Sequence, residues 1–384
     1  MSFVLTHLGI VSALGVGAEE TGRRLFAGDT SGMKRMSGLA EGGSTMFGFA
    51  PLPAAAFAAA PTRIGALVDA AMSQLRPALA ALYAEVGASR VGAVVGTSNS
   101  TMEEFTDNPD EIDMAYPAER LAETWGVGGP AWSVSTACSS SAKVFASARR
   151  LLASGVCDAV VVGGADAHTR TVVEGFHALE SLAEGLTRPL CADRDGINLG
   201  EGAAFFIMRK AGRGVRLLGV GESSDAYHLT APDPDGVGAE AAMRAALDDA
   251  RLRPEDVDYV NLHGTGTVYN DAMECAAVRR VFGTRVICSS TKPLTGHCLG
   301  AAGAIEAALC SLALLRPEGL PPHCAEPVDT ALAPFPVAAR DNAAKADVIL
   351  SNSFAFGGSN ASVILARDVL AEGPVATCAA TSEP

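Results

Sequence analysis

The order of apolar runs and glycine loops in the first half of this chain occurs again in the second half. The segments RVGAVVGTS (90–98) and VDYVNLHGTGT (257–267) each read as a buried strand that leads into a loop. Further along, 131–155 and 285–315 each give a strand, a turn and a helix. Because strand and helix signals alternate, we predict an α/β protein built from a duplicated unit.

The division between the two halves falls near residues 210–216, after a predicted strand at 202–210. We therefore expect an N-terminal half over 1–212 and a C-terminal half over 213–368. The last residues, 369–384, have no hydrophobic period and are predicted to form a flexible tail.

Composition and charge exclude several classes of protein. Hydrophobic residues make up 48% and charged residues 19% of the chain, which predicts a packed globular protein. No apolar run is long enough for a membrane span, and no Lys or Arg precedes the first apolar stretch as in a signal peptide. The net charge of −14 makes nucleic acid a poor partner. Nine cysteines without regular spacing fit reduced thiols, so a cytoplasmic location is expected.

Cys138 lies in WSVSTACSSSAKVF (132–145), where a predicted strand gives way to a helix. A lone cysteine is more often an inert core residue. Here, however, the helix is expected to begin at about Ala137 or Cys138. A thiol in a first helical turn faces unpaired N–H groups and the positive end of the helix dipole, which predicts a lowered pKa. The small neighbouring residues leave room for a substrate to approach the sulfur.

His263 and His297 lie in glycine-bracketed loops that follow predicted strands of the second half. Each alone could be a capping or satisfied core histidine, but their matching positions favour partners for a nucleophilic Cys138. Lys292 is either a solvated lysine or a buried charge near these histidines, and Glu274 is then its best candidate partner. The remaining histidines with no such context are read as surface or packing residues: His7, His168, His177 and His323.

The glycine loop FAFGGSNA (354–361) could cradle a phosphate, hold an oxyanion or turn the chain. It lacks the P-loop lysine, and no G-x-G-x-x-G motif follows a strand, so a nucleotide role is weak. The chain has no G-x-S-x-G elbow of a serine hydrolase. No Cys/His spacing fits a zinc site, and no metal is expected.

Six motifs occur in the order found in the β-ketoacyl-acyl-carrier-protein synthases, the elongating condensing enzymes of the thiolase superfamily. They are STACSSS, RPLCADRDGINLGEGAA, DAYHLTAPDPDG, HGTGT, TKPLTGHCLGAAGAIE and NSFAFGGSNA. The resemblance spans nearly the whole chain and implies a five-layered αβαβα thiolase fold, usually dimeric. It implies decarboxylative condensation of malonyl-ACP with an acyl group, and no cofactor beyond the phosphopantetheine arm of the acyl carrier protein.

The resemblance also implies a role for each matching residue. Cys138 would be the acylated nucleophile, and His263 and His297 the catalytic histidines. Phe356 would be the gate, and its N–H and that of Cys138 would form the oxyanion hole. Lys292 and Glu274 would be supporting charges, and Thr265 and Thr267 would contact the phosphopantetheine arm.

Several departures from the family pattern resemble ketosynthase subunits of aryl polyene or xanthomonadin-type pigment pathways. They include the shortened stretch 180–190, GINLGEGA, and Ala355 in the gate loop. An aryl or polyene acyl chain is therefore expected in a pocket lined by Phe176 and Met102, and Phe354 is a further substrate-binding candidate. The alternatives are a primary fatty-acid elongation synthase and a non-catalytic partner that sets chain length.

Basic residues that could dock an acidic carrier protein are sparse. We hypothesise that a partner subunit completes the docking patch, in a homodimer or in a heterodimer with a chain-length-factor-like paralogue. The candidates within this chain are Lys34, Arg35, Arg63, Arg149, Arg150 and Arg188.

Overall fold

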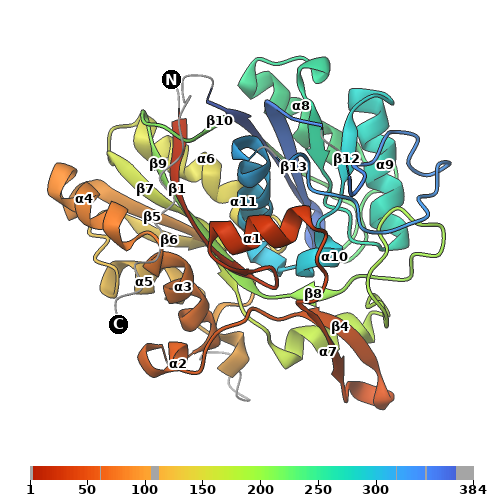
Figure 1. The fold of residues 1–384 in the computed structure, drawn as a ribbon, viewed down its shortest axis with the longest axis horizontal. Coiled ribbons are helices and arrows are strands. Elements are labelled where there is room, and N and C mark those ends of the chain that lie inside the picture. Colours follow the sequence, from red (N-terminus) through yellow and green to blue (C-terminus); the bar gives the residue numbers. More distant parts are fainter. Residues whose placement is uncertain (1–2, 61, 105–111, 317, 342–343, 369–384) are drawn as a thin grey trace.

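The computed structural model describes residues 3–60, 62–104, 112–316, 318–341 and 344–368, and the predicted tail at 369–384 lies outside them. The main sheet has eleven described strands, ten of which follow one another across it in two halves (Figure 1). The N-terminal half has, in spatial order, β1 (Phe3–Ser12), β9 (Gly202–Arg209), β7 (Ala159–Asp166), β5 (Val91–Gly96) and β6 (Ala131–Val134). The C-terminal half has β10 (Val215–Ser224), β14 (Ser359–Arg367), β13 (Val348–Phe354), β11 (Tyr259–Asn261) and β12 (Ile287–Ser289).

The two halves have the same strand pairing. In each, the second strand pairs antiparallel with the first and the third, and the last three strands are parallel to one another. The halves join where β1 and β10 pair antiparallel, from Phe3 opposite Leu217 to Leu5 opposite Val215. The predicted duplication is therefore confirmed, while the boundary at 212/213 stays a prediction.

Helices cover both faces of each half and give five layers. Two helices lie in the central layer, α6 (Ser140–Ala153) and α11 (Ala302–Leu315). The outer layers hold α3 (Arg63–Ser73) and α5 (Tyr116–Glu123) on the N-terminal half, and α8 (Val237–Ala250) and α9 (Val268–Phe282) on the C-terminal half. Because α11 contacts strands of both halves, it is buried from Ala302 to Leu314.

The remaining helices and strands surround these layers. A small sheet contains β3 (Met33–Ser37), β4 (Ser44–Gly48) and β8 (Leu199–Gly200), and β2 (Gly15–Val16) pairs with β1. The other helices are α1 (Ala18–Phe26), α2 (Ala56–Ala59), α4 (Arg76–Val86), α7 (Arg170–Ala178) and α10 (Lys292–Thr295). Short 3-10 turns are η1 (Ala40–Gly42), η2 (Ala88–Arg90), η3 (Ser100–Glu104), η5 (Pro254–Asp256), η6 (Leu299–Ala301) and η7 (Phe356–Gly358).

The alanine-rich stretch before β5 forms two helices. Helix α3 begins after Thr62, whose hydroxyl accepts a hydrogen bond from the Gly65 N–H, and it ends at Ser73. Helix α4 starts at Arg76 with Pro77 in its first turn, where a missing N–H costs no hydrogen bond. Among the described helices, none has the length and apolar character needed to cross a membrane.

Candidate active site

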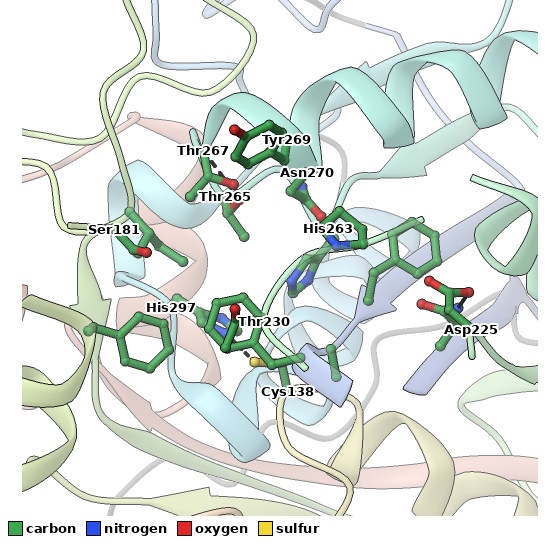
Figure 2. A pocket seen from close by; sticks show the side chains of 17 residues that line it. Cys138, Ser181, Asp225, Thr230, His263, Thr265, Thr267, Tyr269, Asn270 and His297 are labelled. Atoms are coloured by element: carbon green, nitrogen blue, oxygen red, sulfur yellow. Dashed lines mark hydrogen bonds between the residues drawn. The ribbon is translucent and has the colours of Figure 1, made fainter. Parts of the chain in front are cut away.

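Loops from both halves meet at a cavity of about 90 Å³ that Cys138, His263 and His297 line together (Figure 2). Cys138 follows β6, His263 follows β11, and His297 follows α10. The His297 Nε2 lies 2.9 Å from the Cys138 Sγ, and the rings of His263 and His297 meet edge to face with centroids 5.2 Å apart. The structure thus brings together the three residues that the motifs nominate.

A strained turn presents the Cys138 sulfur to the cavity. Helix α6 begins only at Ser140, so Cys138 precedes the helix and does not lie in its first turn. Ala137 has a φ of 51°, a left-handed conformation that is costly for a residue with a side chain. The Ser140 hydroxyl fixes this turn, because it accepts from the Thr136 N–H (2.9 Å) and donates to the Ala137 carbonyl (2.5 Å).

The predicted lowering of the Cys138 pKa is wrong. Burial raises the pKa of the Cys138 thiol to about 12, although the charge of Lys292 and the N–H groups of Phe356 and Cys138 favour the thiolate. Desolvation of the charged form outweighs these contributions because the thiol is only 7% exposed. The resting site therefore holds a neutral thiol, which must lose its proton during attack.

His263 and His297 are held as neutral imidazoles. Burial lowers the pKa of each well below 6.5, and the charge of Lys292 lowers both further. A neutral ring has one N–H donor and one free acceptor nitrogen. His297 can therefore take a proton from the sulfur beside it, and either ring can donate an N–H to a substrate oxygen.

Lys292 forms its ion pair with Glu306 of α11. The prediction that Glu274 would be its partner is therefore wrong. The Lys292 Nζ lies 2.5 Å from the Glu306 Oε1 and donates to the His263 carbonyl at 2.6 Å. Glu306 is the only charged residue inside the otherwise uncharged helix α11. That isolation was a usable signal, because a buried carboxylate requires a partner.

Glu274 instead holds the loop that carries His263. Its carboxyl accepts from the N–H groups of His263 and Gly264, both at 2.8 Å, and from the Asn352 Nδ2 at 3.1 Å. Burial raises the pKa of Glu274 to about 7, although these three hydrogen-bond donors lower it. Glu274 therefore positions the His263 loop through its backbone.

The predicted gate residue lies beside the sulfur. The Phe356 N–H is directed at Cys138, and its ring stacks on Phe176 with centroids 5.5 Å apart. Phe354 lines the cavity and approaches the His263 ring, with centroids 6.1 Å apart. Thr265 and Thr267 also line it, with their hydroxyls 2.9 Å apart. The roles assigned to these residues stay predictions.

Met102 does not line this cavity. It lies on η3, which packs against α3, α5 and α7. The chain turns at Ser100, whose hydroxyl donates to the Asp113 carbonyl. The expectation that Met102 contacts the acyl chain stays a prediction.

Two further contacts at the site have no motif of their own. The Ser139 hydroxyl donates to the Ser359 hydroxyl at 3.1 Å, which ties the nucleophile turn to the gate loop. His323 is buried, with its Nδ1 3.3 Å from the Ser290 nitrogen and its Nε2 3.1 Å from the Pro189 carbonyl. His323 therefore supports the turn that leads into Lys292. No group of three or more possible metal-ligating side chains occurs in the described residues.

His323 predicts a pH dependence of stability. Burial lowers the pKa of His323 from 6.5 to about 4. Between these two values the His323 ring binds a proton in the unfolded chain but not in the folded protein. Stability should therefore fall as the pH falls, by about 2 kcal/mol for this group between about pH 7 and about pH 5. Urea unfolding measures the loss of unfolding free energy between these two pH values, and that loss should be smaller in His323→Gln than in the wild-type protein by this amount. An equal loss in both proteins would contradict the prediction.

The chain is similar in sequence to a known protein family and to several proteins with names. The family models "Beta-ketoacyl synthase, N-terminal domain" and "Beta-ketoacyl synthase, C-terminal domain" match residues 55–212 and 215–325. Nodulation protein E of Rhizobium leguminosarum bv. trifolii is 42% identical over 252 residues, covering 62% of this chain and 61% of that protein. The 3-oxoacyl-[acyl-carrier-protein] synthase 2 of Coxiella burnetii is 34% identical over 320 residues, covering 74% of this chain and 77% of that protein.

Solved structures resemble the whole chain. The ketosynthase ApeO from Xenorhabdus doucetiae, solved in complex with its chain length factor ApeC, has a TM-score of 0.89 and 37% identity. That match covers 96% of this chain and 98% of the other. The ishigamide ketosynthase/chain length factor has a TM-score of 0.85 and 28% identity, over 96% and 99% of the two chains. These matches confirm the thiolase fold, and the chain belongs to the β-ketoacyl synthase family.

Proposed function

We propose that this chain catalyses the decarboxylative condensation of malonyl-ACP with an acyl group held on Cys138, giving 3-oxoacyl-ACP, carbon dioxide and free ACP. The observation that carries the proposal is the Cys138 sulfur 2.9 Å from His297 Nε2, with His263 beside it in the same cavity. No cofactor is proposed beyond the phosphopantetheine arm of the carrier.

Acylation of the thiol comes first. The Cys138 thiol gives its proton to His297 Nε2 as the sulfur attacks the carbonyl carbon of an acyl thioester. The N–H groups of Cys138 and Phe356 hold the resulting oxyanion. When the intermediate collapses, the C–S bond to the carrier breaks and the proton passes to the departing carrier thiolate. His297 is then neutral again.

Condensation follows when malonyl-ACP occupies the same cavity. Loss of carbon dioxide places enolate charge on the thioester oxygen, and N–H groups of neutral His263 and His297 stabilise it. Each such donor contributes roughly 3 kcal/mol, or about a hundredfold in rate. The carbanion attacks the acyl-cysteine carbonyl and the C–S bond to Cys138 breaks. The departing Cys138 thiolate takes a proton from water, which restores the thiol.

The proposal extends to a pathway of the aryl polyene or xanthomonadin type, with a chain-length-factor-like paralogue as partner. The ApeO structure supports the partner, because that ketosynthase was solved with a chain length factor. A homodimer is the other arrangement. A cytoplasmic location is part of the proposal, since the eight described cysteines are all free thiols.

A second candidate is elongation of saturated chains in primary fatty-acid synthesis. The relatives named 3-oxoacyl-[acyl-carrier-protein] synthase 2 favour it, including the Coxiella burnetii protein. A non-catalytic partner role is disfavoured by the intact group of Cys138, His263 and His297.

An intact-mass assay tests these candidates. The protein, alone and with its paralogue, is incubated with carrier protein loaded with saturated, polyenoyl or cinnamoyl chains. An adduct on Cys138 that forms preferentially with the unsaturated chains is the expected result. Preference for long saturated chains would support primary synthesis instead, and absence of any adduct on the folded protein would refute the catalytic role.

A further inference from the structure

The mouth of the cavity carries exposed apolar side chains, which we call the mouth rim: Tyr227, Leu229, Val268 and Tyr269. Their exposed fractions are 58% for Tyr227, 76% for Leu229, 54% for Val268 and 73% for Tyr269. Large apolar side chains exposed together on a protein surface commonly mark a binding surface.

The mouth rim is continuous with the cavity on two sides. Tyr227 and Leu229 lie in the loop before α8 and precede Thr230, which lines the cavity. Val268 and Tyr269 form the first turn of α9 directly after Thr267, and Thr267 and Tyr269 also line the cavity (Figure 2). The Leu229 carbonyl accepts a hydrogen bond from the Gly357 N–H at 2.7 Å, which holds this loop against the gate.

The charges around the mouth do not favour an acidic partner. Among the described residues that line the cavity, none is Lys or Arg, and Asp225 is the only acid. The loop at 224–236 carries Asp225, Asp233 and Asp235 without a Lys or Arg. Arg194 reaches the Val268 carbonyl at 3.4 Å, but its side chain is 10% exposed and lies 4.0 Å from the carboxyl of Asp271.

Most of the basic residues proposed from the sequence as docking candidates already form ion pairs within the chain. All of them except Lys34 form ion pairs with carboxylates of the described chain: Arg35 with Glu184, Arg63 with Glu201, Arg149 with Asp249, Arg150 with Glu222 and Arg188 with Asp193. The Arg63 partner, Glu201, is fully buried, so this arginine supports the fold. Among these six candidates, Lys34 alone is without a carboxylate partner in the described chain.

We infer that the carrier protein docks on the mouth rim through apolar contacts, so that its binding is insensitive to salt. The inference rests on the proposed function, because an acyl group that reaches Cys138 through this cavity leaves the body of its carrier at the mouth. The partner that fits is a carrier with apolar side chains around the attachment point of its arm. Salt screens charge attraction but leaves apolar contact intact.

The test compares two acyl donors. Octanoyl-loaded acyl carrier protein needs the docking surface, whereas octanoyl-N-acetylcysteamine enters the cavity without it. For the double variant Leu229→Ser/Val268→Ser, the KM for the loaded carrier in acylation of Cys138 should rise about tenfold. The KM for the small donor should stay unchanged, and the carrier KM of the wild-type protein should not rise between about 0.05 M and about 0.5 M salt.

Two matched controls separate docking from general effects. Val156→Ser removes an exposed apolar side chain just before β7, at the amino-terminal end of the parallel strands, whereas Cys138 follows their carboxyl end. This variant should leave both KM values unchanged. Lys34→Ser removes the one candidate docking cation that forms no ion pair in the described chain, and it should also leave both KM values unchanged.

Four outcomes would overturn the inference. They are an unchanged carrier KM in the double variant, a carrier KM that rises about tenfold with salt, an equal rise with the small donor, and a changed oligomeric state without a change in carrier KM. The last would show that another subunit covers the rim. Acylation by neither donor would overturn the proposed function itself, and this inference with it.

Discussion

Cys138→Ala should form no acyl adduct and should lose condensation by at least about a thousandfold, while still releasing carbon dioxide from malonyl-ACP. The substitution removes the proposed nucleophile. It leaves His263 and His297 in place, and these two rings are the proposed donors to the enolate oxygen. Adduct formation is followed by intact mass, and decarboxylation by the appearance of acetyl-ACP.

His297→Ala is the matched comparison, because His297 is assigned to both steps. It should lower the rate of adduct formation and the rate of decarboxylation together, whereas Cys138→Ala should separate them. Condensation by Cys138→Ala near the wild-type rate would show that another group carries the acyl chain. Loss of decarboxylation in Cys138→Ala with the fold intact would show that the histidines do not act independently of the sulfur.

Lys292→Met should destabilise the protein by about 3–5 kcal/mol, because it leaves the carboxyl of Glu306 buried without its partner. The side chains of Lys292 and Glu306 are 1% and 4% exposed, so water cannot replace the lost ion pair. The free energy of unfolding is measured by denaturant titration against the wild-type protein.

The double variant Lys292→Met/Glu306→Leu distinguishes the two functions of this pair. Replacing both charges with apolar side chains should restore most of the lost stability. Condensation should stay impaired, because the His263 carbonyl has lost the Lys292 ammonium and the histidines have lost a neighbouring positive charge. A double variant as unstable as Lys292→Met would show that the ammonium stabilises the fold through the His263 loop instead.

The fold could be predicted because the apolar residues recur with the periods of strands and helices, and because the same order of elements occurs in both halves of the sequence. The runs at 90–98 and 257–267 became the equivalent strands β5 and β11, and the same holds for β6 and β12. The break between α3 and α4 is hard to predict, because the apolar pattern continues across Gln74 and Leu75. Pro77 is the sequence signal of that break, because proline is favoured in the first turn of a helix and disfavoured inside one.

The site could be predicted only as far as residue identity determines chemistry. The motifs place Cys138, His263 and His297 together, and the structure agrees. The pKa of Cys138 could not be predicted, because burial opposes the nearby N–H groups and their balance depends on exposure. The partner of Lys292 depends on how α11 packs against the turn before it, and chain order alone does not give that packing.

The division of the active site between the two halves has a consequence for synthesis of the protein. Cys138 belongs to the first half, and the loops that carry His263 and His297 belong to the second. A chain still growing on the ribosome exposes the thiol before either histidine exists. Such a chain has no histidine beside the sulfur, and the gate loop, proposed to supply the second oxyanion donor, is made after both histidines. On the proposed mechanism, acylation of Cys138 should therefore begin only once the gate loop has been synthesised.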